Sequence, residues 1–385
     1  MNKFIKICAI SLTAIGVLIL LVFLKKTSLD GYSIFSRTDY SVTGQFGDFV
    51  GGVVGTFFAL SGTLLIFLSF IQQSNENKRI SFESSFFEMI RLHRENISEL
   101  RYNKYKSGKT EEYHNRQVIS LIFKEFIECY RDVKKFSNSR NIDDYILPKY
   151  KRHLEKIINK INPEIDLIEM VIIDISWSIT FYGLSVDGES VIRKAFLKKY
   201  NQHYYSRLLF YIKLKPKKTN VRRHNNWILL RGLPLNELHP LIEELYNNRK
   251  NPRDTIGLSG RAISLKVYLT YEKYYGGHQF RLGHYFRHLF QSFTFVNTNR
   301  DLNPEQKYFY AKLLRAQLST YEQSLLFVNS ISTLGMKWEL NPEKKASLIT
   351  AYNLIKNLPG EHIYGIKYKK YYPNVDYEFD EQLKF

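Results

Sequence analysis

Two long uncharged apolar runs near the N-terminus restrict this chain more than any other feature. The first, Ile7–Leu24, has 18 residues, lies between Lys6 and Lys25, and contains no charged side chain. As a helix it is about 27 Å long, close to the thickness of a bilayer's hydrocarbon core. A cleaved signal peptide is the alternative, but no small-residue cleavage site follows the run. We therefore expect a retained membrane helix.

The second run, Phe49–Ile71, has 23 residues and no charge, which again favours a membrane span. A buried helix of a soluble protein is the alternative. Gly51, Gly55 and Ala59 recur every four residues and share one helix face, which Thr63 continues. Small residues let helices approach closely in lipid, so we expect this face to pack on the first helix.

The basic residues around these runs predict a helix hairpin with both ends in the cytoplasm. Lys3 and Lys6 precede the first run, and Lys78, Arg79, Arg91 and Arg94 follow the second. Residues 72–385 then form one large cytoplasmic region.

The rest of the chain is predicted to be mainly α-helical. Apolar side chains recur at helical spacing in most segments, whereas no clear strand alternation is present. The expected helices are Ser81–Leu100, Glu112–Phe136, Pro148–Ile161, Pro163–Phe181, Ser190–Leu214, Leu258–Tyr275, Gln279–Val296, Pro304–Leu334 and Pro342–Asn357. Short strands are allowed at Ile363–Tyr368 and Trp227–Leu230. The helix ending at Phe181 contains Glu169 and Asp174, so we expect a buried core helix and not a third span.

The resulting domain organisation has four parts. We expect a membrane hairpin at 1–73 with spans at about 7–24 and 49–71, and a helical region at 74–215. A basic and polar linker region follows at 216–257, and a second helical region at 258–385.

Neither the cysteines nor the standard catalytic motifs indicate an enzyme. Cys8 and Cys129 lie far apart, which excludes a disulfide scaffold and a cysteine-rich zinc module. The sequence contains no phosphate-binding GxxxxGK[ST] loop, no GxGxxG, no GxSxG and no HExxH. We therefore expect no cofactor.

The sharpest local cluster is QFRLGHYFRHLFQ, where Arg281, His284 and His288 share one helix face. Arg281 followed by His288 resembles the Arg-x4–6-His motif of HEPN-type helical ribonucleases, although Leu282 stands where that motif usually has a polar residue. The resemblance implies a metal-independent ribonuclease. A metal held by the two histidines is disfavoured because no acidic or thiol ligand is near.

The same cluster also has a structural interpretation. Arg287 and Arg315 are long cations on helices that are otherwise rich in apolar residues. Buried cations need a carboxylate or carbonyl partner. We expect acidic residues such as Glu322 to supply it.

A second signal is a stretch of 47 residues, 190–236, that contains no acidic residue. It carries 12 cations: Arg193, Lys194, Lys198, Lys199, Arg207, Lys213, Lys215, Lys217, Lys218, Arg222, Arg223 and Arg231. Phe196, Tyr200, Tyr204, Tyr205, Tyr211 and Trp227 alternate with them. Cations with exposed aromatic rings are typical of nucleic-acid binding, and cations alone suit anionic lipid. An internally paired surface is the third alternative, with the acidic tail Asp376, Glu378, Asp380 and Glu381 as one available partner.

Three separated blocks resemble an AbiC-like bacterial family of phage abortive infection proteins. They are Gly44–Gln73 with Phe82–His93, Gly283–Gln291 with the motif GHYFRHLFQ, and Tyr310–Gly335 with the motif LRAQLS. The family blocks contain Tyr285, Phe286, Arg287, Arg315, Gln317 and Glu322.

The resemblance implies a membrane protein that limits phage multiplication, in the cytoplasmic membrane of a bacterium. We expect a non-enzymatic sensor and effector that meets a phage component or nucleic acid while its hairpin rearranges or assembles. The alternatives are the tethered ribonuclease and an adaptor for a neighbouring defence protein. Expected partners are the lipid bilayer, a phage component or nucleic acid, and a second copy or a neighbouring defence protein.

Overall fold

The computed structural model describes residues 2–32, 39–106, 109–251, 255–258, 261–263, 265, 274–340 and 347–382. It is mainly α-helical, as predicted. The chain divides into two compact units, Met1–Phe87 and Glu88–Phe385, and the division falls within one long helix.

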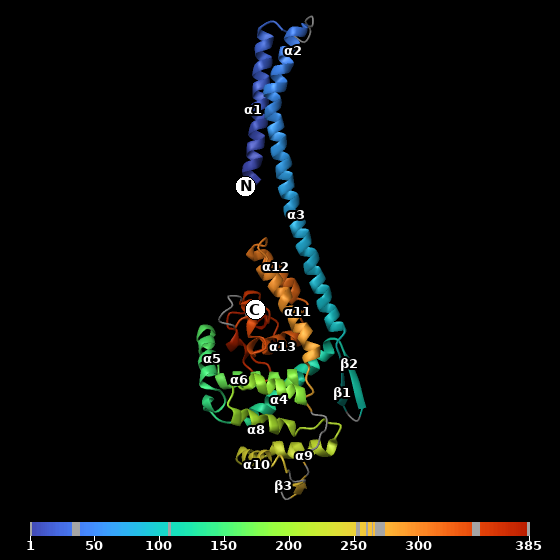
Figure 1. The fold of residues 1–385 in the computed structure, drawn as a ribbon, viewed down its shortest axis with the longest axis vertical. Helices are drawn as coiled ribbons and strands as arrows, with labels where there is room; N and C mark the ends of the chain where they lie inside the picture. Colours follow the sequence, from blue (N-terminus) through green and yellow to red (C-terminus); the bar gives the residue numbers. More distant parts are fainter. Residues whose placement is uncertain are drawn as a thin grey trace. The chain divides into compact units, whose positions relative to one another are not determined.

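The first unit is an antiparallel helix hairpin (Figure 1). It consists of α1 (Asn2–Leu29), α2 (Tyr40–Phe49), the π-helical turn η1 (Val50–Val54) and the first part of α3 (Gly55–Ser98). By length and composition, two helical segments could cross a membrane, Lys3–Leu29 and Tyr40–Ser98. Large apolar side chains such as Ile10, Leu18 and Phe70 are exposed, as lipid-facing side chains are.

The contact between the two helices of the hairpin lies on a different face of α3 from the predicted one. Ser61 is buried, and its hydroxyl donates to the Ala9 carbonyl at 2.8 Å and lies 2.7 Å from the Thr13 hydroxyl. Val54 and Leu68, seven residues to either side of Ser61, are also buried. In hydrocarbon these hydroxyls have no water partner, so they bond across the helices.

Gly16 on α1 is the glycine at which the two helices approach most tightly. A Cβ at Gly16 would lie 3.1 Å from the Cβ of Phe57, whereas a Cβ at Gly51 would have no neighbour within 4 Å. Gly51 and Ala59 are exposed, and a Cβ at Gly55 would meet only its own helix. The prediction that Gly51, Gly55 and Ala59 form the packing face is therefore wrong. The face of α3 that contacts α1 is the one that carries Ser61.

A cysteine pair tests this hairpin contact. In a Cys8→Ser background, Thr13→Cys with Ser61→Cys is expected to form a disulfide on mild oxidation and resist maleimide labelling, because the two hydroxyls are 2.7 Å apart. The matched control, Thr13→Cys with Gly51→Cys, should remain labelled. Equal labelling of the two pairs would contradict the contact.

The second unit is built around three helices. The central α4 (Arg116–Phe136) packs against α6 (Leu167–Tyr182), and α13 (Thr320–Ile331) packs on both. Helix α6 is apolar on most faces, and Trp177 at its middle is fully buried. Its Asp174 is also buried and accepts from the Thr333 amide at 2.7 Å, so α6 is a core helix, as predicted.

Further helices extend this core on the other side of α4. Helix α8 (Gln202–Lys213) packs on α4, and α10 (Leu235–Asn247) packs on α8 (Figure 1). This part also contains β1 (Arg101–Lys106), β2 (Lys109–His114), η2 (Ile142–Asp144), α5 (Pro148–Ile161), α7 (Val186–Phe196), α9 (Val221–Gly232), β3 (Ile256–Leu258) and β4 (Arg261–Ile263).

The C-terminal part begins with α11 (Gln279–Thr298), which packs on α6 and on α12 (Pro304–Arg315). After α13 the elements are short. They are η3 (Met336–Trp338), α14 (Leu348–Ala351), α15 (Tyr368–Tyr371) and α16 (Glu378–Gln382).

Several predicted helices are correct. Pro148–Ile161 is α5, Gln279–Val296 lies within α11, and Ser81–Leu100 lies almost wholly within α3. Pro163–Phe181 corresponds to α6, which starts four residues later and ends one residue later. Asp166 caps its start by accepting from the Ile168 amide.

Other segments that were expected as single helices are divided. The segment Ser190–Leu214 contains the end of α7 and most of α8. The helix is interrupted because the backbone of Lys199–Asn201 is extended and hydrogen-bonds to residues 145–147. Pro304–Leu334 is α12 and α13, because Ser319 and Glu322 form a capping box that starts a new helix.

A third group of predictions is wrong about the type of element. The hairpin β1–β2 precedes α4 where a helix was expected from Glu112. The hairpin β3–β4 occupies the start of the expected helix Leu258–Tyr275, and most of its remainder lies outside the described residues. Residues 216–257, expected as a linker, contain α9 and α10.

The last stretches of the chain also differ from expectation. Of the expected helix Pro342–Asn357, the first residues lie outside the described part, and the remainder contains only the four-residue α14. The Trp227–Leu230 strand is helical within α9, and Ile363–Tyr368 contains one isolated bridge, between Ile363 and Ile366. The four domain boundaries themselves stay predictions.

Candidate functional site

Six of the twelve cations of the acid-free stretch form the ion pairs described here, five of them with carboxylates of other helices. Lys215 is buried, and its ammonium group lies 2.9 Å from the Asp132 carboxylate and 3.4 Å from that of Glu128, both on α4. Arg231 lies 2.5 Å from Asp132. Lys218 lies 3.5 Å from Glu128. The fold therefore turns these cations toward the acidic face of α4.

Two further carboxylates pair with the middle of the stretch. Glu189 at the start of α7 meets Arg193 at 2.8 Å and Lys213 at 2.7 Å. Glu243 on α10 accepts two hydrogen bonds from the Arg207 guanidinium, at 2.8 and 2.7 Å. Such bidentate hydrogen bonding is among the strongest interactions that an arginine makes with a carboxylate.

The aromatic residues of the stretch are not a stacking platform. Phe196, Tyr200, Tyr205, Tyr211 and Trp227 are all at most 3% exposed. They fill the space among α7, α8 and α9, so the expectation of exposed rings for base stacking is wrong. Tyr204, half-buried, contacts the Ser137 hydroxyl at 2.5 Å.

The remaining cations have different surroundings. Lys194, Lys198 and Arg222 are exposed. Lys199 lies over the Tyr150 ring at 5.7 Å, and burial lowers the pKa of its ammonium group. Lys217 and Arg223 are half-buried.

The acidic tail does not neutralise the stretch. Asp376 accepts from Asn353 at 2.9 Å, Asp380 pairs with Lys369 at 2.6 Å, and Glu378 accepts from Asn357. The Glu381 side chain lies outside the described residues. The described tail carboxylates therefore bind within the C-terminal part.

A buried carboxylate extends the acidic face of α4. Glu125 lies 3.3 Å from the His278 imidazole and accepts from the Tyr102 hydroxyl at 3.1 Å. Burial alone would raise the pKa of Glu125, but His278, Lys104 and Tyr102 outweigh it and hold the pKa below its ordinary value. The pKa of Glu128 is also lowered, because Lys215 and Tyr274 outweigh its burial.

These shifts predict acid destabilisation of the second unit. A carboxylate with a lowered folded-state pKa stabilises the fold above its unfolded pKa, about 4.3, and this contribution is lost as the pH falls through the folded-state value. The thermal transition of the solubilised chain should be nearly constant from about pH 7 to 5 and fall below about pH 4.5. All three tryptophans, Trp177, Trp227 and Trp338, are buried in this unit, so their fluorescence reports it alone. A transition temperature unchanged from about pH 5 to 3 would contradict the assignment.

The Arg281 and His288 side chains of the α11 motif bond to backbone carbonyls of other segments. Arg281 donates to the Arg101 carbonyl at 2.9 Å and lies over the Tyr102 ring, and burial lowers its pKa. His288 bonds through Nε2 to the Met89 carbonyl at 2.8 Å. Each side chain is thus bonded to a different stretch of backbone. His284 is exposed.

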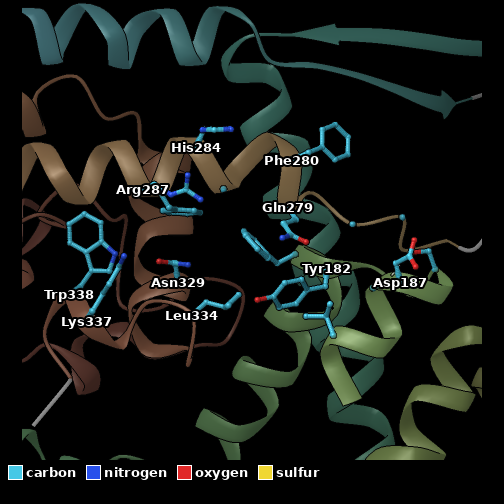
Figure 2. Close-up of a pocket in the computed structure, with 18 residues that line it drawn as sticks. Tyr182, Asp187, Gln279, Phe280, His284, Arg287, Asn329, Leu334, Lys337 and Trp338 are labelled. Atoms are coloured by element: carbon cyan, nitrogen blue, oxygen red, sulfur yellow. Dashed lines mark hydrogen bonds between the residues drawn. The ribbon is translucent and has the colours of Figure 1, made fainter. Parts of the chain in front are cut away.

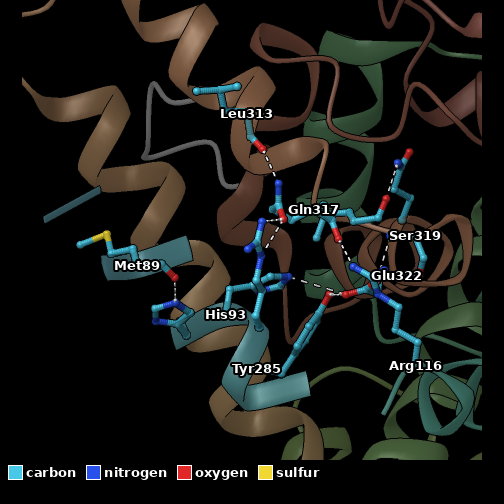
Figure 3. A network of polar contacts seen from close by, with 12 residues as sticks. Met89, His93, Arg116, Tyr285, Leu313, Gln317, Ser319 and Glu322 are labelled. Carbon is cyan, nitrogen blue, oxygen red and sulfur yellow. Dashed lines mark hydrogen bonds and ion pairs between the residues drawn. The ribbon is translucent and has the colours of Figure 1, made fainter. Parts of the chain in front are cut away.

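Beside this motif, the family-block residues form a buried polar network (Figure 3). Tyr285 donates to Glu322 at 3.2 Å, and Arg116 and His93 lie 3.4 and 3.7 Å from the same carboxylate. Glu322 also accepts from the amide and hydroxyl of Ser319. Burial would raise the pKa of Glu322, but His93 and Ser319 outweigh it and lower the pKa.

The predicted arginine partners are partly corrected. Glu322 does pair with α11, but through Tyr285 and not through Arg287. Arg315 is buried and donates to the carbonyls of Tyr352 and Asn353 at 2.9 and 3.2 Å. It therefore bonds to backbone carbonyls and not to the expected carboxylate of Glu322.

Gln317 fixes the end of α3 within the second unit. Its side-chain oxygen accepts from the Arg94 guanidinium at 3.0 and 2.8 Å, and its carbonyl accepts from Arg116 at 2.7 Å. Residues of the block thus hold α3, α4 and α11 together. Phe286, the neighbour of Tyr285, packs edge-on against Trp177.

A pocket of about 630 Å³ lies on the other side of α11 (Figure 2). Arg287, Phe280 and His284 line it from α11, Asn329 from α13, and Lys337 from η3. The exposed Arg287 makes no hydrogen bond or ion pair with any residue that the structure describes, so the expectation that it is a buried paired cation is wrong.

The pocket wall at the start of α11 is formed where two backbone segments cross so closely that only glycine fits. Gly183 and Gly277 both have positive φ, +78° and +85°, and a Cβ on Gly277 would lie 2.5 Å from the Tyr182 carbonyl oxygen. Sequence reasoning missed this wall and its neighbours Asn329 and Lys337. The Gly276–Gly277 pair beside the motif was the signal that could have indicated it.

Comparison with known proteins adds one match. Residues 277–363 match a family described as putative phage abortive infection protein. Over these residues, the abortive infection segment, the AbiC-like resemblance is confirmed. The segment contains α11, α12, α13 and most of the pocket's residues. The comparisons with curated proteins and with solved structures gave no match.

Proposed function

We propose that this chain is a membrane-anchored abortive infection protein that limits phage multiplication through a non-enzymatic effect on the membrane. The match of residues 277–363 carries the assignment to phage defence. The two long apolar helical segments support the anchoring. In this proposal the hairpin crosses the bacterial cytoplasmic membrane twice, both ends of the chain face the cytoplasm, and the second unit responds to infection there.

The contacts of α11 support a non-enzymatic role. A ribonuclease of the HEPN type needs its arginine and histidine free to meet one phosphodiester. Here Arg281 and His288 are each bonded to a backbone carbonyl, and neither lines the pocket. The acid-free stretch gives no support to nucleic-acid binding either, because five of its six aromatic rings are buried and the sixth, Tyr204, is half-buried.

Disrupting the first span tests the proposal. Val17→Asp with Leu21→Asp places two charges in the middle of α1, at about 2.5–3.5 kcal/mol each for insertion. Both side chains are exposed on the hairpin, so the second unit should be unaffected. Protection in plaque assays should be lost and carbonate should extract the protein. Lys194→Asp with Lys198→Asp is the matched control for two added acidic residues.

Reporter fusions complete the test of topology. A fusion at residue 35 and one at the C-terminus should report opposite sides of the membrane. Full protection by a variant that is recovered entirely in the soluble fraction would contradict the proposal.

A further inference from the structure

The pocket beside α11 has the chemistry of an anion site. Its charged lining residues are Arg287, Lys337 and the single acid Asp187, with His284 also at its edge. In Figure 2 the Arg287 side chain points from α11 toward Asn329, while Asp187 lies apart from both. An arginine without an ion pair beside a pocket is suited to a phosphate, which it binds through two parallel hydrogen bonds.

Buried polar groups in the pocket also lack partners. Asn329 is 4% exposed, and its side-chain amide makes no hydrogen bond with any described residue, although it points into the space below Arg287. Trp338 is fully buried, and its indole N–H has no acceptor among the residues that the structure describes. Buried donors are rarely left unpaired, so the Asn329 amide is available to a ligand in the pocket.

The Asn329 side chain is held in place by its neighbour Gly335. A Cβ on Gly335 would lie 2.2 Å from the Asn329 carbonyl oxygen and 2.3 Å from its side-chain oxygen. Only glycine fits there, so the turn after α13 packs directly on Asn329. This rigid contact orients the amide toward the pocket.

Two helix starts add to the positive potential. Helix α11 begins at Gln279 and α7 at Val186, and residues from the first turn of each line the pocket. The free amides at a helix start attract anions. The unpartnered Asn329 amide is a second, independent feature that indicates a ligand, so the anion site does not depend on the helix starts alone.

The rest of the pocket wall is aromatic. Phe181, Tyr182, Phe280 and Phe286 line it. Phe280 is 71% exposed, and the Arg281 guanidinium lies 4.3 Å from the centre of its ring, so the opposite ring face is the one available to a ligand. Pockets of 300–1,000 Å³ hold small organic ligands, and about 630 Å³ exceeds what inorganic phosphate needs. Aromatic faces beside cations are how proteins hold a base and its phosphate together.

We propose that this pocket binds a nucleotide, with the phosphate on Arg287 and Asn329 and the base against Phe280. Lys337 adds charge at the end of the pocket near Trp338. Most residues of the site belong to the abortive infection segment, so a nucleotide bound there could regulate the activity of that segment. The proposal does not depend on the membrane effect, because binding is measured without phage.

Titration of the full solubilised chain tests this site. The probes are AMP, ATP, GMP, adenosine and inorganic phosphate. A nucleotide should bind saturably and at least about 10-fold more tightly than adenosine or phosphate, because only it engages both halves of the pocket. Arg287→Gln should weaken nucleotide binding by about 10- to 100-fold. Arg222→Gln, an exposed arginine on α9, is the matched control and should have no effect.

A second variant separates the two halves of the ligand. Phe280→Ala should weaken nucleotide binding by about 10-fold and leave phosphate binding unchanged. Both variants change exposed side chains, so tryptophan fluorescence should show an intact fold. No saturable nucleotide binding at millimolar concentration, or equal affinity in wild type and Arg287→Gln, would overturn the site. Phosphate binding as tightly as any nucleotide would overturn the role of the base.

Discussion

Lys215→Gln is expected to lower the free energy of unfolding of the second unit by about 3 kcal/mol, near the lower end of the range for breaking a buried ion pair. The ammonium group is buried between Asp132 and Glu128 and also donates to Tyr275 at 3.1 Å. Removing it leaves two carboxylates of α4 close together. Asp132 keeps Arg231, which limits the loss.

The measurement is denaturant unfolding followed by tryptophan fluorescence. Lys194→Gln is the matched control, because this lysine lies in the same acid-free stretch but is exposed, and its effect should be within about 0.5 kcal/mol. A variant that removes Lys213, Lys215, Lys217 and Lys218 together should unfold, which makes it unsuitable as a binding probe. Equal stabilities of the Lys215 and Lys194 variants would show that the stretch is not paired internally.

Glu322→Ala should have the largest effect in the abortive infection segment, with a loss of about 3–5 kcal/mol. The carboxylate is fully buried and is shared by Tyr285, Arg116, His93 and the Ser319 cap of α13. Its removal leaves the Tyr285 hydroxyl buried without an acceptor, opens a cavity and weakens the cap. Less folded protein and less phage protection are expected together.

Glu322→Gln is the graded control for this prediction. The amide keeps the shape and one acceptor for Tyr285 but loses the charge beside Arg116 and His93, so a smaller loss is expected. The comparison uses the same unfolding measurement. If Glu322→Ala is fully folded yet gives no protection, the network is a functional site and not a structural one.

The helix hairpin could be predicted from the sequence, because the length of each uncharged apolar run suffices to identify a candidate membrane span. It did not predict which face of α3 meets α1. Small residues at Gly51, Gly55 and Ala59 mark a face that could pack closely, but contact is decided by the partner. Hydroxyls at Thr13 and Ser61 make that contact, and pairs 48 residues apart leave no local pattern.

The acid-free stretch was misread for a related reason. A local excess of charge describes neighbours in sequence, while pairing depends on neighbours in space. Lys215 meets Asp132, which lies 83 positions earlier in the chain. The alternation of cations with aromatic rings resembles a binding surface, yet on α8 the rings Tyr205 and Tyr211 face the core.

The candidate site was the hardest part to predict. The sequence cluster on α11 drew attention to Arg281 and His288, whereas the pocket is lined by His284 and Arg287 of the same helix. Its other walls come from α6, α7, α13 and η3, which only the fold brings together. The hairpin β1–β2 was missed because its strands are polar and show no alternation of apolar and polar residues, and β3–β4 was missed because each of its strands has only three residues.

The most direct test follows membrane potential and total RNA integrity in the same phage-infected culture, with and without the chain. The account predicts that cells with the chain lose potential during infection while ribosomal and messenger RNA remain intact. His288→Ala should leave this result unchanged if the protein is folded. Cleaved RNA that precedes any loss of potential, and that His288→Ala abolishes, would contradict the account and establish a tethered ribonuclease.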